Sequence, residues 1–169
     1  MANLYRFHDW VEINVSASVG KNAVNNKDDV IVVQAMLKYA LEWRTYFGSA
    51  PFPRPTGAVD SATLALIRKY QQYLRRTRGS KISVDGRIDP AKDRAAFGKK
   101  GQWTIQMLNG DVAEGWLVWD RPGDNPIHSL YMEYPEIRNA IGDNIPVGKL
   151  GLSLEPSNRP VGTLNLGLE

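Results

Sequence analysis

The sequence contains no cysteine, and only two of its 169 residues are histidine. A chain without cysteine forms no disulfide bonds, offers no thiolate nucleophile and cannot bind zinc through sulfur. The two histidines, His8 and His128, lie far apart in the sequence and outside any metal-binding motif, so we expect them on the surface. The sequence therefore predicts neither a metal site nor a cofactor.

Long apolar runs are also missing. No stretch approaches the roughly 20 apolar residues of a membrane-spanning helix, and residues 1–10 lack the apolar centre of a secretory signal peptide. We expect a chain that is made in the cytoplasm and contacts no membrane. Its final compartment stays open, because delivery to a periplasm or cell wall could follow cell lysis or use a secretion apparatus.

Catalytic signatures are equally scarce. The sequence has no Gly-x-Ser-x-Gly nucleophile motif and no glycine-rich phosphate-binding loop. Carboxylate pairs such as Asp111 and Glu114 have the residue types of a glycosidase, but spacing alone favours helix-cap and surface roles. The sequence thus predicts a protein that is not an enzyme.

Charge is modest overall but unevenly distributed. The formal net charge of +3 is too small to favour nucleic-acid binding without a recognised motif. Six basic residues nevertheless crowd one short stretch: Arg68, Lys69, Arg75, Arg76, Arg78 and Lys81. Such a cluster is typical of a solvated helix face, but it could also attract the carboxylates of peptides or anionic polymers.

Hydrophobic residues make up 43% of the chain, enough to build a buried core. Alternation of apolar and polar residues predicts a strand over residues 10–17. A first helix is predicted from about residue 27, and a second from Asp60 or Ser61. Their core stripes follow helical spacing: Val30, Val33, Leu37 and Leu41 in the first, and Leu66, Ile67, Tyr70 and Leu74 in the second.

Two more helix signals follow. Asp89 and Pro90 suit the N-cap and first position of a third helix. Residues 103–110 predict a final short helix that ends at Gly110.

The character of the sequence changes at residue 111. Residues 114–119 predict a strand with Trp116 and Trp119 on opposite faces. Alternation over residues 149–155 and 161–168 predicts a hairpin with its leucines on one face, which could pair with the N-terminal strand. We therefore expect an α+β fold in three parts: a strand and connection (1–26), a helical domain (27–110) and a β-rich appendage (111–169).

One pattern appears twice in the helical part. Residues 29–37 read Asp-Val-x-x-Val-Gln-x-x-Leu, and residues 57–71 read Gly-x-Val-Asp-x-x-Thr-x-x-Leu-Ile-x-x-Tyr-Gln. Residues 85–88 add Asp-Gly-x-Ile before the last expected helix. Together these motifs resemble the peptidoglycan-binding-like family of small wall-binding domains, over residues 27–109. The resemblance implies a three-helix core and non-catalytic recognition of bacterial cell-wall peptidoglycan, through its glycan or its stem peptide.

The predicted ligand site lies beside the first two helices. Its candidate residues carry amide, cationic or aromatic groups: Gln34, Arg44, Tyr46, Arg68, Gln71 and Gln72. Amides would bind stem peptides and arginines would pair with carboxylates. Aromatic residues around the end of the first helix and the proline-rich loop could stack on sugars: Trp43, Tyr46, Phe47 and Phe52. Alternatively, Trp43 and Phe47 fill the bottom of a small helical core.

A second function stays open. The same fold could serve as a structural or adaptor protein in a phage tail or contractile secretion apparatus. The leucine rows of the C-terminal β segment would then bind a protein partner or a second copy of the chain.

Overall fold

The computed structural model describes residues 1–7, 10–48, 52, 54–79, 81–92, 103–118, 120, 122–123 and 125–141, with only the backbone given for residues 5–7 and 10. Within these residues lie five α-helices, one 3₁₀ turn (η1, Thr45–Phe47) and four short strands. This mixture of helices and antiparallel strands agrees with the predicted α+β class.

The strands form two separate pairs. β1 (Asn3–Phe7) and β2 (Trp10–Asn14) make an antiparallel N-terminal hairpin. β3 (Val19–Gly20) pairs with β4 (Arg87–Ile88). The strand predicted over residues 10–17 is therefore β2, shorter than expected, and its partner among the described residues is β1. The predicted C-terminal hairpin lies outside the described residues.

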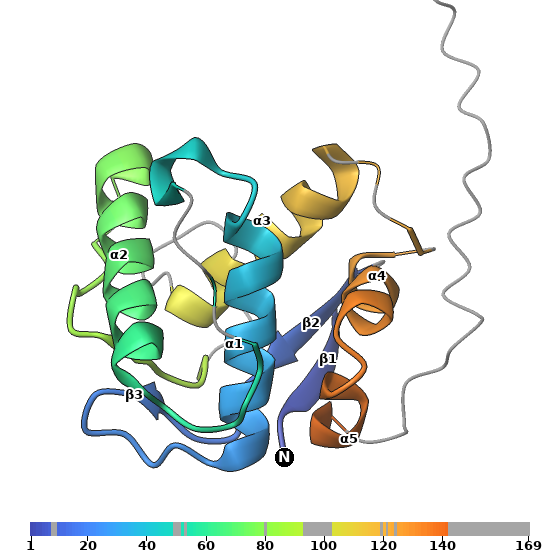
Figure 1. Cartoon of the computed structure of the whole chain (residues 1–169), viewed down its shortest axis with the longest axis horizontal. Helices are drawn as coiled ribbons and strands as arrows, with labels where there is room; N and C mark the ends of the chain where they lie inside the picture. The colour runs from blue at the N-terminus through green and yellow to red at the C-terminus, as the bar shows by residue number, and fades with distance from the viewer. Residues whose placement is uncertain are drawn as a thin grey trace, which may run out of the picture.

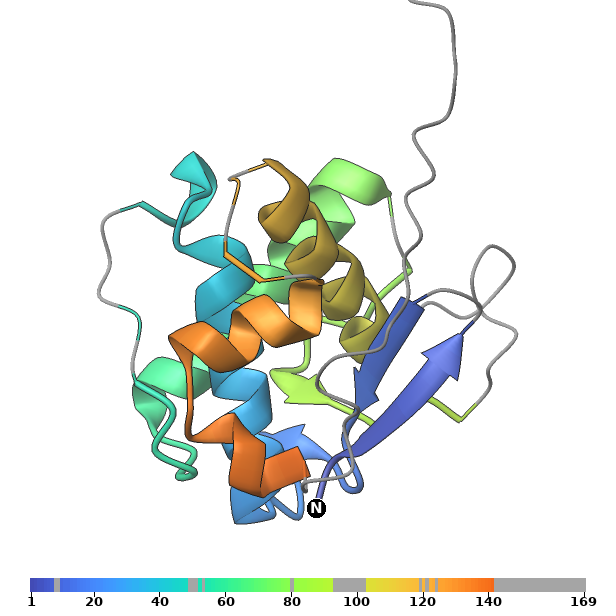
Figure 2. The same cartoon turned by 90° about the vertical axis from the view of Figure 1, so that its right-hand side faces the viewer.

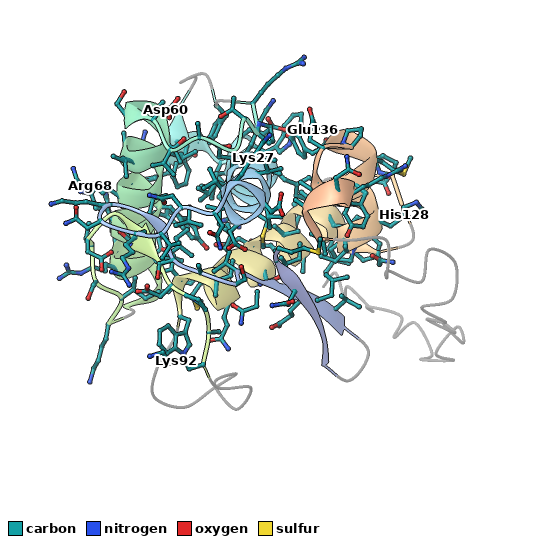
Figure 3. All side chains as sticks on the ribbon, turned by 90° about the horizontal axis from the view of Figure 1, so that it is seen from below. Lys27, Asp60, Arg68, Lys92, His128 and Glu136 are labelled. Atoms are coloured by element: carbon teal, nitrogen blue, oxygen red, sulfur yellow. The ribbon has the colours of Figure 1, made fainter. Side chains whose placement is uncertain are left out.

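Helix α1 (Lys27–Leu41) is the centre of the molecule. Seen end-on, with Lys27 in the middle, it lies between α2 on one side and the α4–α5 segment on the other (Figure 3). The predicted stripe of Val30, Val33, Leu37 and Leu41 is buried, which confirms that prediction. Val32, Met36 and Tyr39 on other faces are buried as well, because neighbours cover α1 nearly all round.

Helix α2 (Ser61–Arg78) also follows the prediction. The Asp60 carboxylate caps it by accepting a hydrogen bond from the Thr63 amide at 2.7 Å. Ile67, Tyr70 and Leu74 are buried, and Gly79 ends the helix with a left-handed φ of 57°.

Helix α3 (Thr104–Val118) corrects two predictions. It continues through Gly110, where we expected a stop, and residues 114–118 are helical rather than a strand. Helical spacing explains this result, since Ile105, Leu108 and Val112 form one buried stripe. Gly115 extends the stripe where α3 approaches α1, because a Cβ there would lie 3.7 Å from the Tyr39 carbonyl. Trp116 is half-buried on this helix, and Trp119 lies outside the described residues.

The predicted third helix at Asp89 and Pro90 is also absent from the described residues 89–92. The Asp89 carboxylate instead accepts hydrogen bonds from Arg87 at 2.7 Å and from the Ser18 hydroxyl. These bonds tie the β3–β4 pair together, so Asp89 serves the tertiary structure rather than a helix cap.

Two more helices replace the predicted β-rich appendage over residues 111–141. They are α4 (Pro126–Glu133), which is capped by Asn125, and α5 (Ile137–Ile141). Ile127, Leu130 and Ile137 belong to the same hydrophobic core as the hairpin and the other helices. α4 is further bonded to α1 through the Tyr39 and Ser129 hydroxyls, 2.6 Å apart.

Candidate functional site

The first glutamine of the repeated pattern binds the turn before α2. The Gln34 Oε1 atom accepts hydrogen bonds from the Thr56 and Gly57 amides at 2.9 and 3.1 Å. Its Nε2 atom donates to the Ala58 carbonyl and the Thr63 hydroxyl, both at 2.9 Å. Gln34 is 1% exposed, so its carboxamide is a buried structural group.

The second glutamine does the same for the next turn. The Gln71 Oε1 atom accepts from the Gly86 amide at 2.8 Å, and Nε2 donates to the Arg87 carbonyl at 2.8 Å and the Asp85 carboxylate at 2.9 Å. Gly57 and Gly86 have almost the same left-handed φ, 77° and 78°, which favours glycine at both turns. We call these two arrangements the glutamine clamps.

The clamps correct the predicted ligand site. Gln34 and Gln71 were candidates for binding stem peptides, but their polar atoms bind this protein's own turns and both residues are buried. Their place in the repeated pattern therefore reflects structure. Gln72, next along the chain, is exposed on α2.

The candidates Arg44 and Tyr46 lie on one surface, together with Tyr73 of α2. The rings of Tyr46 and Tyr73 are 5.3 Å apart, and buried Phe47 packs against both. The Lys69 ammonium lies 5.9 Å from the centre of the Tyr46 ring and donates a hydrogen bond to the Phe47 carbonyl at 3.1 Å. We call the half-buried Tyr46 and Tyr73, with the flanking Lys69 and Arg44, the tyrosine platform.

Arg44 joins this platform to a charged network beneath it. Its guanidinium lies 5.5 Å from the centre of the Tyr73 ring and donates to the Tyr73 hydroxyl at 2.8 Å. The same guanidinium pairs with Asp111 at 3.0 Å and Glu114 at 2.9 Å. Arg44 is therefore held in place by internal partners, with its side chain 20% exposed.

The buried Asp111 carboxylate is the centre of the network. It pairs with Arg44 and Arg78 and accepts a hydrogen bond of 2.6 Å from the Tyr70 hydroxyl. The C-terminal ends of α1, α2 and α3 point to the same end of the molecule, at the top of Figure 1. Arg78 ends α2 and Arg44 follows α1, whereas Tyr70 and Asp111 lie midway along α2 and α3. Arg78 is favoured at its place because a helix C-terminus carries partial negative charge. We call these residues, with Glu114, the Asp111 network.

Burial dominates the electrostatics of this network. It raises the pKa of the Asp111 carboxyl, and the Tyr70 hydroxyl and the two arginines only partly reverse this effect. Burial, together with the Asp111 charge, raises the pKa of Tyr70 well above its ordinary value. For Arg44, burial opposes the charged form, but Glu114 and Asp111 outweigh it and raise its pKa. Asp111 and Glu114, which the sequence suggested as cap or surface residues, thus bind arginines from two other segments.

Two members of the basic cluster contact the residues described above. Half-buried Lys69 lies against the platform, and Arg78, although exposed, pairs with Asp111 in the network. The remaining members are also exposed: Arg68, Arg75, Arg76 and Lys81. Arg68 lies apart from the platform, over the turn at Gly86, where a Cβ would be 2.9 Å from its Nε atom. The predicted candidates therefore do not form one site.

The aromatic residues also divide. Phe47 is 1% exposed, which confirms its alternative role in the core, whereas Trp43 is 52% exposed. The sequence analysis missed Tyr73 as a site residue, although Lys69 and Tyr73 are four positions apart and so share one face of α2.

No group of three or more metal-ligating acidic or histidine side chains occurs within the described residues. None of the described helices is long and apolar enough to cross a membrane. Comparison with known proteins gives no match, whether with family models, with curated proteins or with solved structures.

Proposed function

We propose that this chain is a non-catalytic module that binds bacterial cell-wall peptidoglycan through the tyrosine platform. The proposal rests on the motif resemblance for the ligand class and on one observation for its place. That observation is a pair of half-buried tyrosine rings, 5.3 Å apart, with cationic side chains beside them.

The chemistry of the platform suits an amino sugar chain that bears peptides. Tyrosine faces can stack on the C–H surfaces of sugar rings while their hydroxyls bind polar groups. Lys69 can attract the carboxylates of lactyl groups or stem peptides. Because Phe47 and the Asp111 network hold the platform from behind, binding would cost little ordering.

The family resemblance further implies that α1, α2 and α3 act as a three-helix core. The glutamine clamps support this idea, because they give the recurrent motif residues one repeated structural role. In this proposal the hairpin and the α4–α5 segment are additions around that core.

Pull-down with purified sacculi tests the proposal. We expect the full chain to bind, and Tyr46→Ala to weaken binding about tenfold, or about 1.4 kcal/mol. Phe52→Ala is a matched control, since Phe52 was also a candidate for stacking on sugars but is a half-buried aromatic outside the tyrosine platform. Lys69→Met should also weaken binding, while Lys27→Met, which removes an exposed cation at the opposite end of α1 from Arg44, should change it little. Equal binding by Tyr46→Ala and the wild type would remove the platform from the proposal.

An adaptor of a phage tail or contractile secretion apparatus is the alternative. Leu117 and Val118 at the end of α3 are 63% and 62% exposed, and they share a helix face with Glu114 of the Asp111 network. Such exposed apolar side chains favour contact with a protein partner. Failure of the wild-type chain to bind sacculi, together with self-association in light scattering that Leu117→Ser abolishes, would favour this function.

A further inference from the structure

The edge of β2 that faces away from β1 is covered by Asn109 of α3. The Ile13 amide donates to Asn109 Oδ1 at 2.8 Å, and the Ile13 carbonyl accepts from Asn109 Nδ2 at 2.8 Å. One carboxamide from α3 thus takes the place that a neighbouring strand would occupy. In Figure 2, β2 correspondingly lies between β1 and α3.

This contact fixes the direction of the backbone groups in the hairpin. Ile13 lies opposite Leu4, and both of its main-chain groups point away from β1. Leu4 and Ile13 are therefore a non-hydrogen-bonded pair, so the N–H and C=O of Leu4 point away from β2 as well. Backbone groups two residues apart in a strand point to the same side, so the Ala2 amide also points away from β2. It donates a hydrogen bond to the Ala140 carbonyl of α5 at 3.2 Å.

Among the described residues, no backbone partner occupies the outer edge of β1 beyond Ala2. No hydrogen bond between described residues reaches the outward N–H or C=O of Leu4. The Leu4 side chain is half-buried and packs against the hydrophobic core, so the core surface also reaches this edge. Open edges of this kind bind another strand.

We propose that the outer edge of β1 binds the C-terminal segment of the same chain, with residues 149–155 as the added strand. The Ala2–Ala140 bond places the end of α5 beside the first residues of β1, so the chain leaves Ile141 at this edge. Residues 149–155 alternate leucines with small or polar residues, Leu150, Leu152 and Leu154 against Gly151 and Ser153. This period matches a strand with one face on the core.

The connection is long enough. An extended chain spans about 3.3 Å per residue, so residues 142–148 reach about 23 Å, whereas the five residues of β1 span about 17 Å. The added strand can therefore start at either end of β1. Its leucine face would continue the buried surface beside Leu4, and residues 161–168 could pair with it as the next strand. This inference is independent of peptidoglycan binding.

Hydrogen exchange of the full chain, read by NMR, tests the inference. We expect the Leu4 amide to exchange about 100-fold more slowly than an unprotected amide. The Ile13 amide, bonded to Asn109, is the internal control for an intact hairpin. Exchange of the Leu4 amide at the unprotected rate, with Ile13 protected, would overturn the proposal without any variant.

Two double variants test whether residues 149–155 are the segment that binds the outer edge of β1. Proline cannot donate to a ladder, so Gly151→Pro with Leu152→Pro should release the Leu4 amide and leave Ile13 protected. Gly151→Ala with Leu152→Val changes the same positions but keeps both backbone N–H groups, so it should leave Leu4 protected. Protection of the Leu4 amide that survives the proline substitutions would overturn the assignment of residues 149–155. Protection that disappears on dilution to a monomer would also overturn it, because the edge would then bind another copy of the chain.

Discussion

The glutamine clamps and the Asp111 network both satisfy polar groups inside the molecule, but they differ in charge and in reach along the chain. Each clamp is a neutral carboxamide that binds the next turn, as Gln34 does across 22 residues to Thr56. The Asp111 network joins charged side chains from three segments, as Arg44 does across 70 residues to Glu114.

The difference has a physical consequence. A neutral amide costs little to bury when its donors and acceptors are all bonded. A buried carboxylate is costly unless cations reach it, so Asp111 depends on Arg44 and Arg78 being correctly placed. The clamps therefore stabilise individual turns, whereas the network stabilises the placement of α2, α3 and the residues after α1 relative to one another.

The largest expected effect comes from breaking the network at its centre. Asp111→Ala should lower the free energy of unfolding by about 3 kcal/mol, because two arginines and Tyr70 lose their shared acceptor. Urea denaturation measures the loss. Glu114→Ala is the control, since Glu114 is 49% exposed and should cost about 1 kcal/mol or less. Similar small losses for both variants would mean that the network does not hold the helices.

The clamps should give an intermediate effect. Gln71→Met removes the partners of the Gly86 amide and the Arg87 carbonyl, and should cost about 1–3 kcal/mol. Gln72→Met changes the same residue type at the exposed neighbouring position and should stay within about 0.5 kcal/mol. Thermal and urea unfolding of the two variants measure the difference. Indistinguishable stabilities would contradict the structural role of the clamp.

Glu12 is a half-buried carboxyl to compare with Asp111, because burial is the only cause of its pKa shift, without the arginine partners of Asp111. Burial raises the pKa of its carboxyl from 4.5 to about 7. Between these values the unfolded chain loses the proton while the folded chain keeps it, so stability should fall as pH rises through this window.

Glu12→Gln should remove this slope. Because solvent still reaches the side chain, we expect a stabilisation on the order of 1 kcal/mol above pH 7 and none below pH 4. Urea unfolding at a series of pH values measures it. A wild-type stability that rises between pH 4.5 and 7, with the same slope in the variant, would show that Glu12 is not the group responsible.

The smallest effect on stability should come from the exposed arginines. Arg75→Glu with Arg76→Glu should change the free energy of unfolding by about 0.5 kcal/mol or less per residue. The same charge reversal should weaken sacculus binding and make it less dependent on salt concentration, because salt screens the attraction between exposed charges. Arg78→Glu, two residues away, should instead destabilise the fold through Asp111. Unchanged sacculus binding by the double variant would leave the arginines as a solvated helix face.

The sequence predicted correctly those helices whose spacing and capping residues lie close together in the chain. The starts of α1 and α2, the Asp60 cap and the buried stripes were confirmed, except that Leu66 is only half-buried. Helical spacing and capping depend on neighbouring residues, so the sequence shows them directly. Gly110 was wrongly taken as a helix end, since packing of Gly115 against Tyr39 lets α3 continue. The α4–α5 segment was missed because its burial depends on α1, far away in the sequence.

The predicted ligand site was limited in the same way, because contacts between distant residues could not be predicted. Gln34 and Gln71 stand out in the sequence, yet only the folded turns show that their amides are occupied. Arg44 and Tyr46 do lie on one surface, but their partners Lys69, Tyr73 and Asp111 come from other helices.

By itself the sequence determined the absence of cysteine chemistry, the helical spacing of α1 and α2, and the glycine turns that the clamps require. These properties depend on residue type and on contacts near in sequence. Only the tertiary structure decided which polar groups are buried, which charges neutralise one another and which strand edge Asn109 covers. Those outcomes depend on groups brought together by packing, and no local pattern records which distant residues will meet.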